Sequence, residues 1–197
     1  MSQVTATVDQ AAQWAGRAAV PPEQWNPVYR ALAGAQATTP GELPGRGAVD
    51  LVRRQLTAPA LLTVAVTTAS RTARLRIGAD PVVSTLERSE GDLPSQWSQC
   101  AAQVLPGIIT GLLEDAGVDL SPALTLHDPQ GLRLEQPVTW SRLWATGQKG
   151  LYRLDQPEGP GLAVQAVGGG DLLGTVLPVL ERALRFVGDA RAAGAAR

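Results

Sequence analysis

The chain has 197 residues, of which 44% are hydrophobic and 18% charged, a globular composition that is long enough for one sizeable core. Its formal net charge of −1 creates no field that would attract nucleic acid or an anionic membrane surface, so we expect neither as a partner. Cys100 is the only cysteine and His127 the only histidine, which excludes a disulfide framework or a Cys/His zinc site within one chain.

The N-terminal part, residues 7–57, is predicted to be helical. Thr7-Val8-Asp9-Gln10 has the spacing of a capping box, in which the Thr7 hydroxyl and the Gln10 amide satisfy each other's backbone N–H groups at a helix start. Pro21 and Pro22 stand where a second helix would begin, and a third helix is expected over residues 48–56 after a loop at 34–47.

The first ten residues contain no basic segment and no apolar segment of the kind that secretory signals carry. The longest apolar stretch, residues 104–113, is too short to span a bilayer and is interrupted by Pro106 and two glycines. We therefore expect a cytoplasmic protein that does not insert into membranes.

From residue 61 the hydrophobic residues alternate with a period of two, which predicts a β-hairpin with strands near 61–66 and 72–77. One face of the hairpin would be buried, and the other, with Arg71, Arg74 and Arg76, would face solvent. A third strand is expected near residues 82–88.

After the turn Gly91-Asp92-Leu93-Pro94, Ser95 is the expected N-cap of a helix. Apolar residues further along keep helical spacing beyond Pro106, so we expect the helix to kink or restart there and to end at Gly117. Cys100 would lie on this helix as a small buried hydrophobe rather than as a nucleophile.

The second half of the chain repeats the order of strands followed by a helix. Strands are expected near residues 123–126, 132–135, 150–154 and 162–167, and a helix from Asp171 to about Val187. Val104-Leu105-Pro106 matches Val176-Leu177-Pro178 within the two final helices, and Leu112 matches Leu184.

The predicted fold is a single α+β domain, with one or more antiparallel sheets and helices packed on one face. Two halves, residues 58–117 and 121–190, form an expected pseudo-two-fold repeat. A short tail at 191–197 is expected to fray. Neither the strand order nor the choice between one sheet and two follows from the sequence.

Three groups of residues invite a chemical interpretation, and each also has a structural one. His127-Asp128 resembles a general base with its orienting carboxylate, but it precedes the turn Pro129-Gln130-Gly131 and is more typical of a hairpin end. The acidic residues Glu87, Glu90 and Asp92 form a second group, which could act as paired carboxylates in acid–base or hydrolytic chemistry. Solvated turn charges are the ordinary interpretation.

The third group is the glycine run at residues 168–170, which follows a strand and opens a helix, as phosphate-binding glycines do. No further strand or acidic residue follows at the spacing that a dinucleotide fold needs. The alternative is a turn with Asp171 as the N-cap. We expect no catalytic residue, no cofactor and no metal, and hence no enzyme.

Trp140 and Trp144 are either core residues or anchors for a partner, since exposed tryptophans are favoured at binding hot spots. The first hairpin offers a second candidate contact segment. Its residues in question are Thr68, Ser70, Arg71 and Arg74.

The C-terminal portion resembles the EspG family, the secretion-associated chaperones of actinobacterial type VII (ESX) systems. The segment Pro137-Val138-Thr139-Trp140 is similar to the family's P-x-[ST]-[WF], and Gly150-Leu151-Tyr152 is similar to its G-x-Y strand, which an apolar strand and a leucine-rich helix follow. The strand series after Thr57-Ala58-Pro59 is similar in order. This chain is shorter than the family before Leu61.

The resemblance implies a pseudo-symmetric α+β chaperone or adaptor that binds a helical secretion substrate in the cytosol without a cofactor. The hairpin and the Trp140/Trp144 segment would be its contact sites. Three alternatives stay open: a small-ligand or nucleotide-binding domain or enzyme that uses the turn at 168–174, a structural subunit of a larger assembly, and a homodimer.

Overall fold

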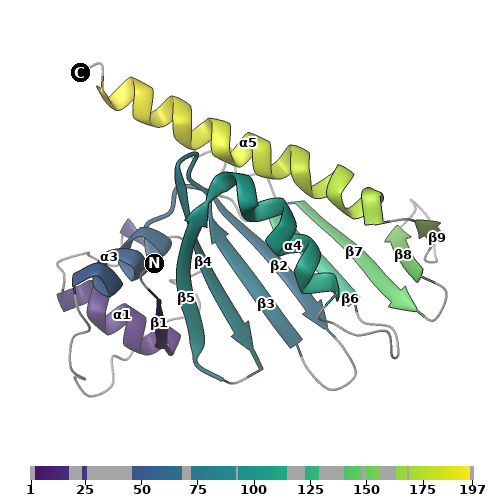
Figure 1. The fold of residues 1–197 in the computed structure, drawn as a ribbon, viewed down its shortest axis with the longest axis horizontal. Coiled ribbons are helices and arrows are strands. Elements are labelled where there is room, and N and C mark those ends of the chain that lie inside the picture. The colour runs from purple at the N-terminus through teal and green to yellow at the C-terminus, as the bar shows by residue number, and fades with distance from the viewer. Residues whose placement is uncertain are drawn as a thin grey trace.

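The structure is a computed structural model that describes residues 3–17, 24–25, 46–67, 72–91, 93–114, 123–128, 140–147, 150–155, 163–167 and 169–195. Within these ranges, nine strands form one sheet in the order β1-β5-β4-β3-β2-β6-β7-β8-β9 (Figure 1). Every neighbouring pair is antiparallel. The predicted α+β class, an antiparallel sheet with helices packed against it, is confirmed.

The bounds of the elements are as follows. The strands are β1 (Val4–Ala6), β2 (Leu61–Thr67), β3 (Thr72–Gly78), β4 (Val83–Glu90), β5 (Ser95–Ala101), β6 (Ala123–Asp128), β7 (Trp140–Gly147), β8 (Gly150–Asp155) and β9 (Ala163–Val167). The helices are α1 (Val8–Arg17), α3 (Arg46–Leu56), α4 (Leu105–Glu114) and α5 (Gly169–Ala195), and a 3-10 turn, η2 (Ala102–Val104), precedes α4.

Two four-stranded meanders make up most of the sheet. Strands β2 to β5 run outward from the middle and lead through η2 into α4, and β6 to β9 run outward the other way and lead into α5. The first strands of the two meanders, β2 and β6, pair with each other at the centre. The order of elements is thus the same in the two expected halves, while their origin by duplication stays a prediction.

Helices α4 and α5 lie over one face of the sheet and enclose the main apolar core (Figure 1). The sequence predicted one buried face for β2 and β3 from their alternating hydrophobic residues. Those residues do point into this core. The buried members from the four central elements include Leu62, Val64, Leu75, Ile77, Ile109, Leu112 and Leu180. Leu184, which the sequence matched to Leu112, packs against the same core.

Helices α1 and α3 cover the other face of the sheet at its β1–β5 end, so the helices pack on both faces and not on one as expected. A second apolar cluster lies there, and its largest members are Trp14, Trp25, Leu51, Leu56 and Trp97. The prediction that this face of the hairpin is exposed to solvent is therefore wrong for Arg76, which is only 3% exposed. The reason is tertiary, because a helix from before the hairpin folds back over these strands.

The capping box at the start of α1 is confirmed. The Thr7 N–H donates to Gln10 Oε1 at 2.9 Å, and the Gln10 N–H donates to Thr7 Oγ1 at 3.1 Å. The predicted third helix is α3. Strand β1, which precedes the box, was not expected. Of the expected loop at 34–47, residues 46 and 47 belong to α3 instead, and the rest lies outside the described residues, as does most of the second helix.

The helix expected to start at Ser95 is wrong, because residues 95–101 form β5. This strand pairs with β4 on one side and β1 on the other, so its backbone groups are satisfied across the sheet. Because a strand and a 3-10 turn, and not an α-helix, lead into α4, the expected kink or restart at Pro106 is instead a helix start: α4 begins at Leu105, and its second residue is this proline, whose missing N–H costs nothing in a first turn. Gly117 lies outside the described residues.

In the second half, β6, β8 and β9 occur where strands were expected, and β7 was not expected. Residues 132–135 lie outside the described residues. Helix α5 begins at Gly169, so Asp171 lies within it and is not its N-cap. The helix also continues through Ala195, into the segment for which fraying is predicted, and Arg191 in that segment binds Asp80 in the β3–β4 turn.

Candidate functional site

The predicted contact residues of the first hairpin are only partly described. Thr68, Ser70 and Arg71 lie outside the described residues. Arg74 lies in β3 and is half-buried. Burial lowers the pKa of its guanidinium, and the positive charge of Arg76 lowers it further.

The register of the strands relates this hairpin to the two tryptophans in β7. Val66 near the end of β2 pairs with Leu124, and Leu124 pairs with Trp144, so all three share one row across the sheet. Adjacent strands lie about 4.8 Å apart, which places the Trp144 backbone about 14 Å from β3. Trp140 pairs with Asp128, toward the opposite end of the strands. The backbone of Trp144, and not that of Trp140, therefore lies near the end of the strands that carries the hairpin turn. The row of Val66, Leu124 and Trp144 together with the hairpin turn is called the contact edge.

A buried ion pair lies beneath α3. Arg76 Nη1 in β3 lies 2.8 Å from Glu87 Oε2 in β4, with 4% and 0% of the two side chains exposed. The Ser95 hydroxyl donates to Glu87 Oε1 at 2.7 Å. The interpretation of Glu87 as a solvated turn charge is therefore wrong, because α3 covers the face of the sheet to which it points.

Gln55 connects α3 to the same two strands. Its amide Nε2 donates to the Arg76 carbonyl at 3.1 Å, and its Oε1 accepts from the Gly78 N–H at 3.2 Å and from the Thr85 hydroxyl. The side chain thereby serves β3 as a peptide group of a neighbouring strand would. A Cβ at Gly78 would lie 2.8 Å from Gln55 Oε1 and closer still to Thr85 Oγ1, so this close approach requires glycine.

Next to this connection, a cleft of about 410 Å³ opens between the end of α3, the β3–β4 turn and the C-terminal part of α5. Three segments far apart in the sequence form its walls. They contribute the apolar residues Ala58, Pro59, Ala79, Val83, Val187 and Ala190, and the polar or charged residues Arg54, Thr57, Asp80, Thr85 and Arg191, with Gly78 between them.

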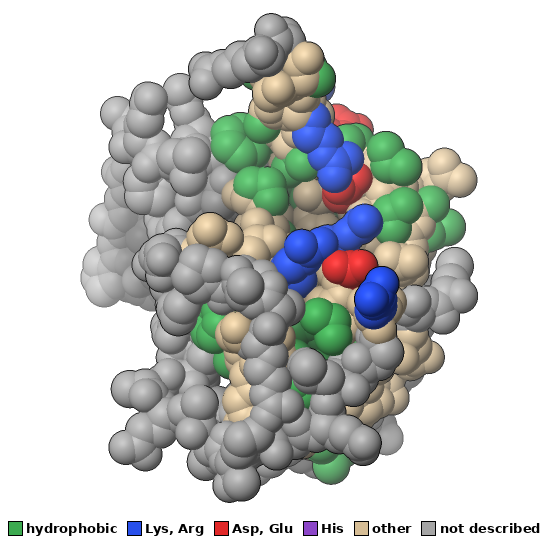
Figure 2. All heavy atoms as spheres, turned by 90° about the vertical axis from the view of Figure 1, so that its left-hand side faces the viewer, with side chains coloured by type: hydrophobic (Ala, Val, Ile, Leu, Met, Phe, Trp, Pro, Cys, Tyr) green, Lys and Arg blue, Asp and Glu red, His purple; other side chains and the backbone are tan. Residues whose placement is uncertain are grey.

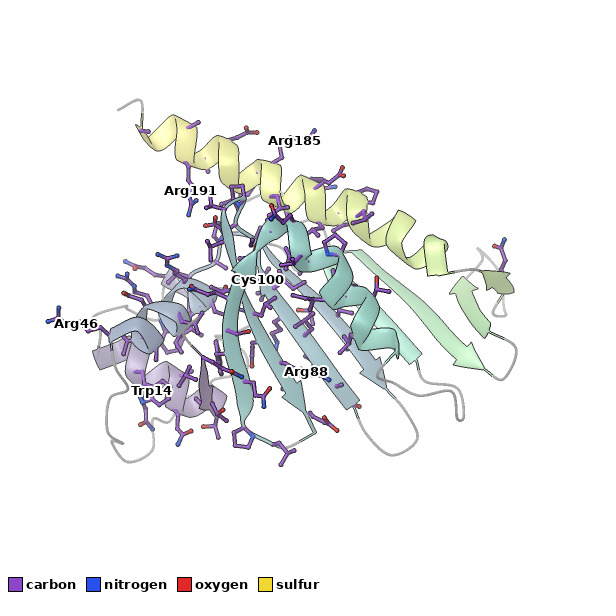
Figure 3. All side chains as sticks on the ribbon, viewed as in Figure 1. Trp14, Arg46, Arg88, Cys100, Arg185 and Arg191 are labelled. Carbon is purple, nitrogen blue, oxygen red and sulfur yellow. The ribbon has the colours of Figure 1, made fainter. Side chains whose placement is uncertain are left out.

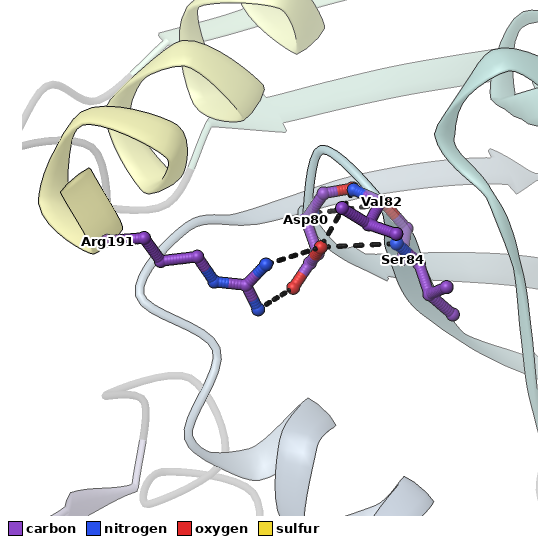
Figure 4. Close-up of polar contacts among 5 residues, drawn as sticks. Asp80, Val82, Ser84 and Arg191 are labelled. Atoms are coloured by element: carbon purple, nitrogen blue, oxygen red, sulfur yellow. Dashed lines mark hydrogen bonds and ion pairs between the residues drawn. The ribbon is translucent and has the colours of Figure 1, made fainter. Parts of the chain in front are cut away.

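Asp80 organises one wall of this cleft (Figure 4). Its Oδ1 accepts from the backbone N–H groups of Val82 and Val83, at 2.9 and 3.1 Å, which holds the turn. Arg191 of α5 binds both carboxylate oxygens in a bidentate pair, with Nη1 3.1 Å from Oδ1 and Nη2 on Oδ2. The charge of Asp80 is thus matched by Arg191 on the neighbouring wall.

Arg54 stands on the facing wall, in the last turn of α3. It is exposed and makes no ion pair or side-chain hydrogen bond within the described part of the chain, whereas its neighbour Arg53 pairs with Asp50 at 2.9 Å. Figure 2 shows basic and acidic side chains gathered in one band on this face. Figure 3 shows Arg191 pointing from α5 toward the sheet and Arg185 pointing away from it.

The sequence offered a signal for part of this cleft. Asp80 before Pro81 is typical of a turn in which the carboxylate binds backbone N–H groups two and three residues on. No sequence signal connects Asp80 to Arg191, because they are 111 positions apart and meet only in the folded chain.

The remaining chemical candidates are not brought together. Cys100 is buried in β5, not in a helix, and burial raises the pKa of its thiol. His127 lies in β6, paired with Thr63 and Ser141, and the turn after Asp128 lies outside the described residues.

The glycine run divides at its second member, since Gly169 and Gly170 are the first residues of α5. No cluster of three or more His, Cys, Asp or Glu side chains able to hold a metal occurs in the described ranges. None of the helices in those ranges is both long and apolar enough to cross a membrane.

No protein-family model matches this chain, and no curated protein matches it.

Proposed function

We propose that this chain is a cytoplasmic protein-binding chaperone or adaptor that recognises a helical segment of a type VII secretion substrate, as the EspG-like segments at residues 137–154 imply. The arrangement of two meanders, each followed by a helix, agrees with the pseudo-symmetric α+β architecture that this resemblance implies.

The observation that carries the proposal is the common row of the hairpin end and Trp144. A helix laid across β3, β2, β6 and β7 would have to cover about 14 Å to reach both segments. Ten residues of α-helix are about 15 Å long, so a short helical segment suffices. Tryptophan is among the residue types that most often dominate binding energy at such surfaces.

The test is affinity purification of the tagged chain from native lysate of its own host, followed by mass spectrometry. We expect a small helical protein to be recovered with the wild type and with Trp140→Ala, and to be lost with Trp144→Ala. Trp140 is a matched control because it has the same side chain in the same strand, four residues away. Circular dichroism of both variants establishes that each is folded.

Recovery that is the same for both tryptophan variants would contradict the contact edge. The absence of any specific partner from wild-type purifications would contradict the chaperone itself.

A further inference from the structure

We propose that the cleft between α3, the β3–β4 turn and α5 binds an acidic side chain of a peptide segment, with the carboxylate between Arg54 and Arg191. This site is separate from the contact edge proposed above. Strand β3 is seven residues long, with the hairpin turn at one end and the cleft at the other, so about 20 Å lie between them.

The charges in the cleft favour an anion. Arg191 and Asp80 compensate each other, while Arg54 has no partner within the described residues, so the cleft has one uncompensated positive charge. Arg191 also has donors left, since a guanidinium has five N–H groups and the pair with Asp80 occupies two. An incoming carboxylate would accept from Arg54 on one side and from Arg191 on the other.

The carboxylate of Asp80 sets the orientation of one donor in advance. Because Val82 and Val83 hold Asp80, and Asp80 holds the Arg191 guanidinium, that guanidinium loses little further freedom when a ligand binds. The side chain of Arg191 is nevertheless 56% exposed, so its free edge is accessible.

The size and the apolar lining favour a peptide. A cleft of about 410 Å³ is in the usual range for small ligands, and its alanine, valine and proline residues provide contacts for aliphatic stems. No described residue that lines it is aromatic, so it lacks the stacking surface that nucleobases use. A Glu or Asp side chain on a peptide matches both the charge and the apolar lining.

The test is binding of fluorescein-labelled hexaglutamate to the full chain, measured by fluorescence anisotropy at about 0.1 M salt, where the Debye length is about 10 Å. Labelled hexaglutamine is the uncharged probe. We expect binding of hexaglutamate only, and we expect Arg54→Gln to weaken it at least about threefold, the effect of an exposed ion pair of about 0.7 kcal/mol.

Arg46→Gln is the matched control. It removes the same charge from the same helix, at an exposed residue that points away from the body of the molecule (Figure 3). Eight residues of helix separate Arg46 from Arg54, about 12 Å, which is beyond the Debye length under these conditions. An equal loss of binding in Arg46→Gln would mean diffuse attraction and would overturn the site.

Asp80→Asn provides a test of opposite sign. The amide oxygen still accepts from the Val82 and Val83 N–H groups, so the turn is kept, while removal of the negative charge raises the net positive charge of the cleft. We expect this gain to exceed the lost orientation of Arg191, so hexaglutamate should bind more tightly. Weaker binding in this variant, or equal binding of hexaglutamine to the wild type, would overturn the proposal. If an excess of inorganic phosphate displaced the labelled hexaglutamate completely, the cleft would be a site for a free oxyanion, and the proposal of a peptide ligand would be contradicted.

Discussion

Helices α3 and α5 differ in the polar contacts that attach them to the sheet. Both bury apolar residues, but beneath α3 there is also a buried polar connection, with Gln55 bonded to β3 and β4 and the Arg76–Glu87 pair next to it. Beneath α5 the contacts are apolar, through Leu180, Ala183 and Val187, and an ion pair near its end joins Arg191, whose side chain is 56% exposed, to Asp80, whose side chain is 17% exposed.

The comparison teaches that an ion pair's contribution depends on what surrounds it. A buried pair repays the cost of removing two charges from water only while both partners are present, so the loss of one leaves an uncompensated charge. An exposed pair is screened and can be replaced by water. The α3 connection should therefore be intolerant of single substitutions, and the α5 contact tolerant of them.

The largest effect is expected from Glu87→Ala. It removes the partner of the buried Arg76 guanidinium and the acceptor of the Ser95 hydroxyl. We expect the free energy of unfolding to fall by about 3–5 kcal/mol, as for other broken buried pairs. Urea denaturation followed by circular dichroism measures this loss.

The double variant Arg76→Met/Glu87→Leu distinguishes a broken pair from a merely sensitive position. Replacing both charges by apolar side chains removes the uncompensated ion, so stability should recover most of the loss. If the double variant were as unstable as Glu87→Ala, the cause would be packing and not charge.

A smaller loss is expected from Gln55→Ala. This change leaves the Gly78 N–H and the Arg76 carbonyl without the partner that the amide provides at a completely buried site. We expect a loss of about 2–3 kcal/mol, the range for buried polar groups deprived of a partner. A loss below the roughly 1 kcal/mol typical of any point mutation would show that the connection is not specific.

Gly78→Ala should cost less, about 1–2 kcal/mol, because the added Cβ forces the Thr85 hydroxyl and the Gln55 amide oxygen to shift but removes neither of them. Gly111→Ala in α4 is the matched control, since a Cβ added at Gly111 would have no heavy atom of the described residues within 4 Å outside its own helix backbone and chain neighbours. There we expect no loss and a gain of up to about 1 kcal/mol, as a helical alanine replaces glycine. Thermal unfolding of the two variants in parallel measures the difference.

The sequence predicted those parts of the fold that depend on local patterns, and it missed those that depend on contacts between distant segments. The apolar alternation of Leu62, Val64, Leu75 and Ile77 identified β2 and β3, because it is a local pattern that one buried face imposes. The capping box identified the start of α1 for the same reason, since Thr7 and Gln10 satisfy each other locally.

Burial by distant elements left no such pattern. Trp97 and Cys100 point to opposite faces of β5 and are both buried, so this strand has no alternation, and Ser95 resembles a helix cap although it binds Glu87. The charges of Arg76 and Glu87 were interpreted as exposed because nothing in the hairpin indicates that α3 covers them. Of the cleft, only the turn at Asp80 was locally visible.

The smallest effect is expected from Arg191→Gln, which breaks the exposed pair with Asp80. The Arg191 side chain is 56% exposed, so water replaces much of what the pair provides, and we expect a loss of no more than about 1 kcal/mol. High salt should reduce the difference between this variant and the wild type, because screening weakens the pair. Salt should change the loss in Glu87→Ala far less, because that pair is buried. Urea denaturation of both variants at low and high salt therefore tests the contrast itself, and equal salt dependence in the two would contradict it.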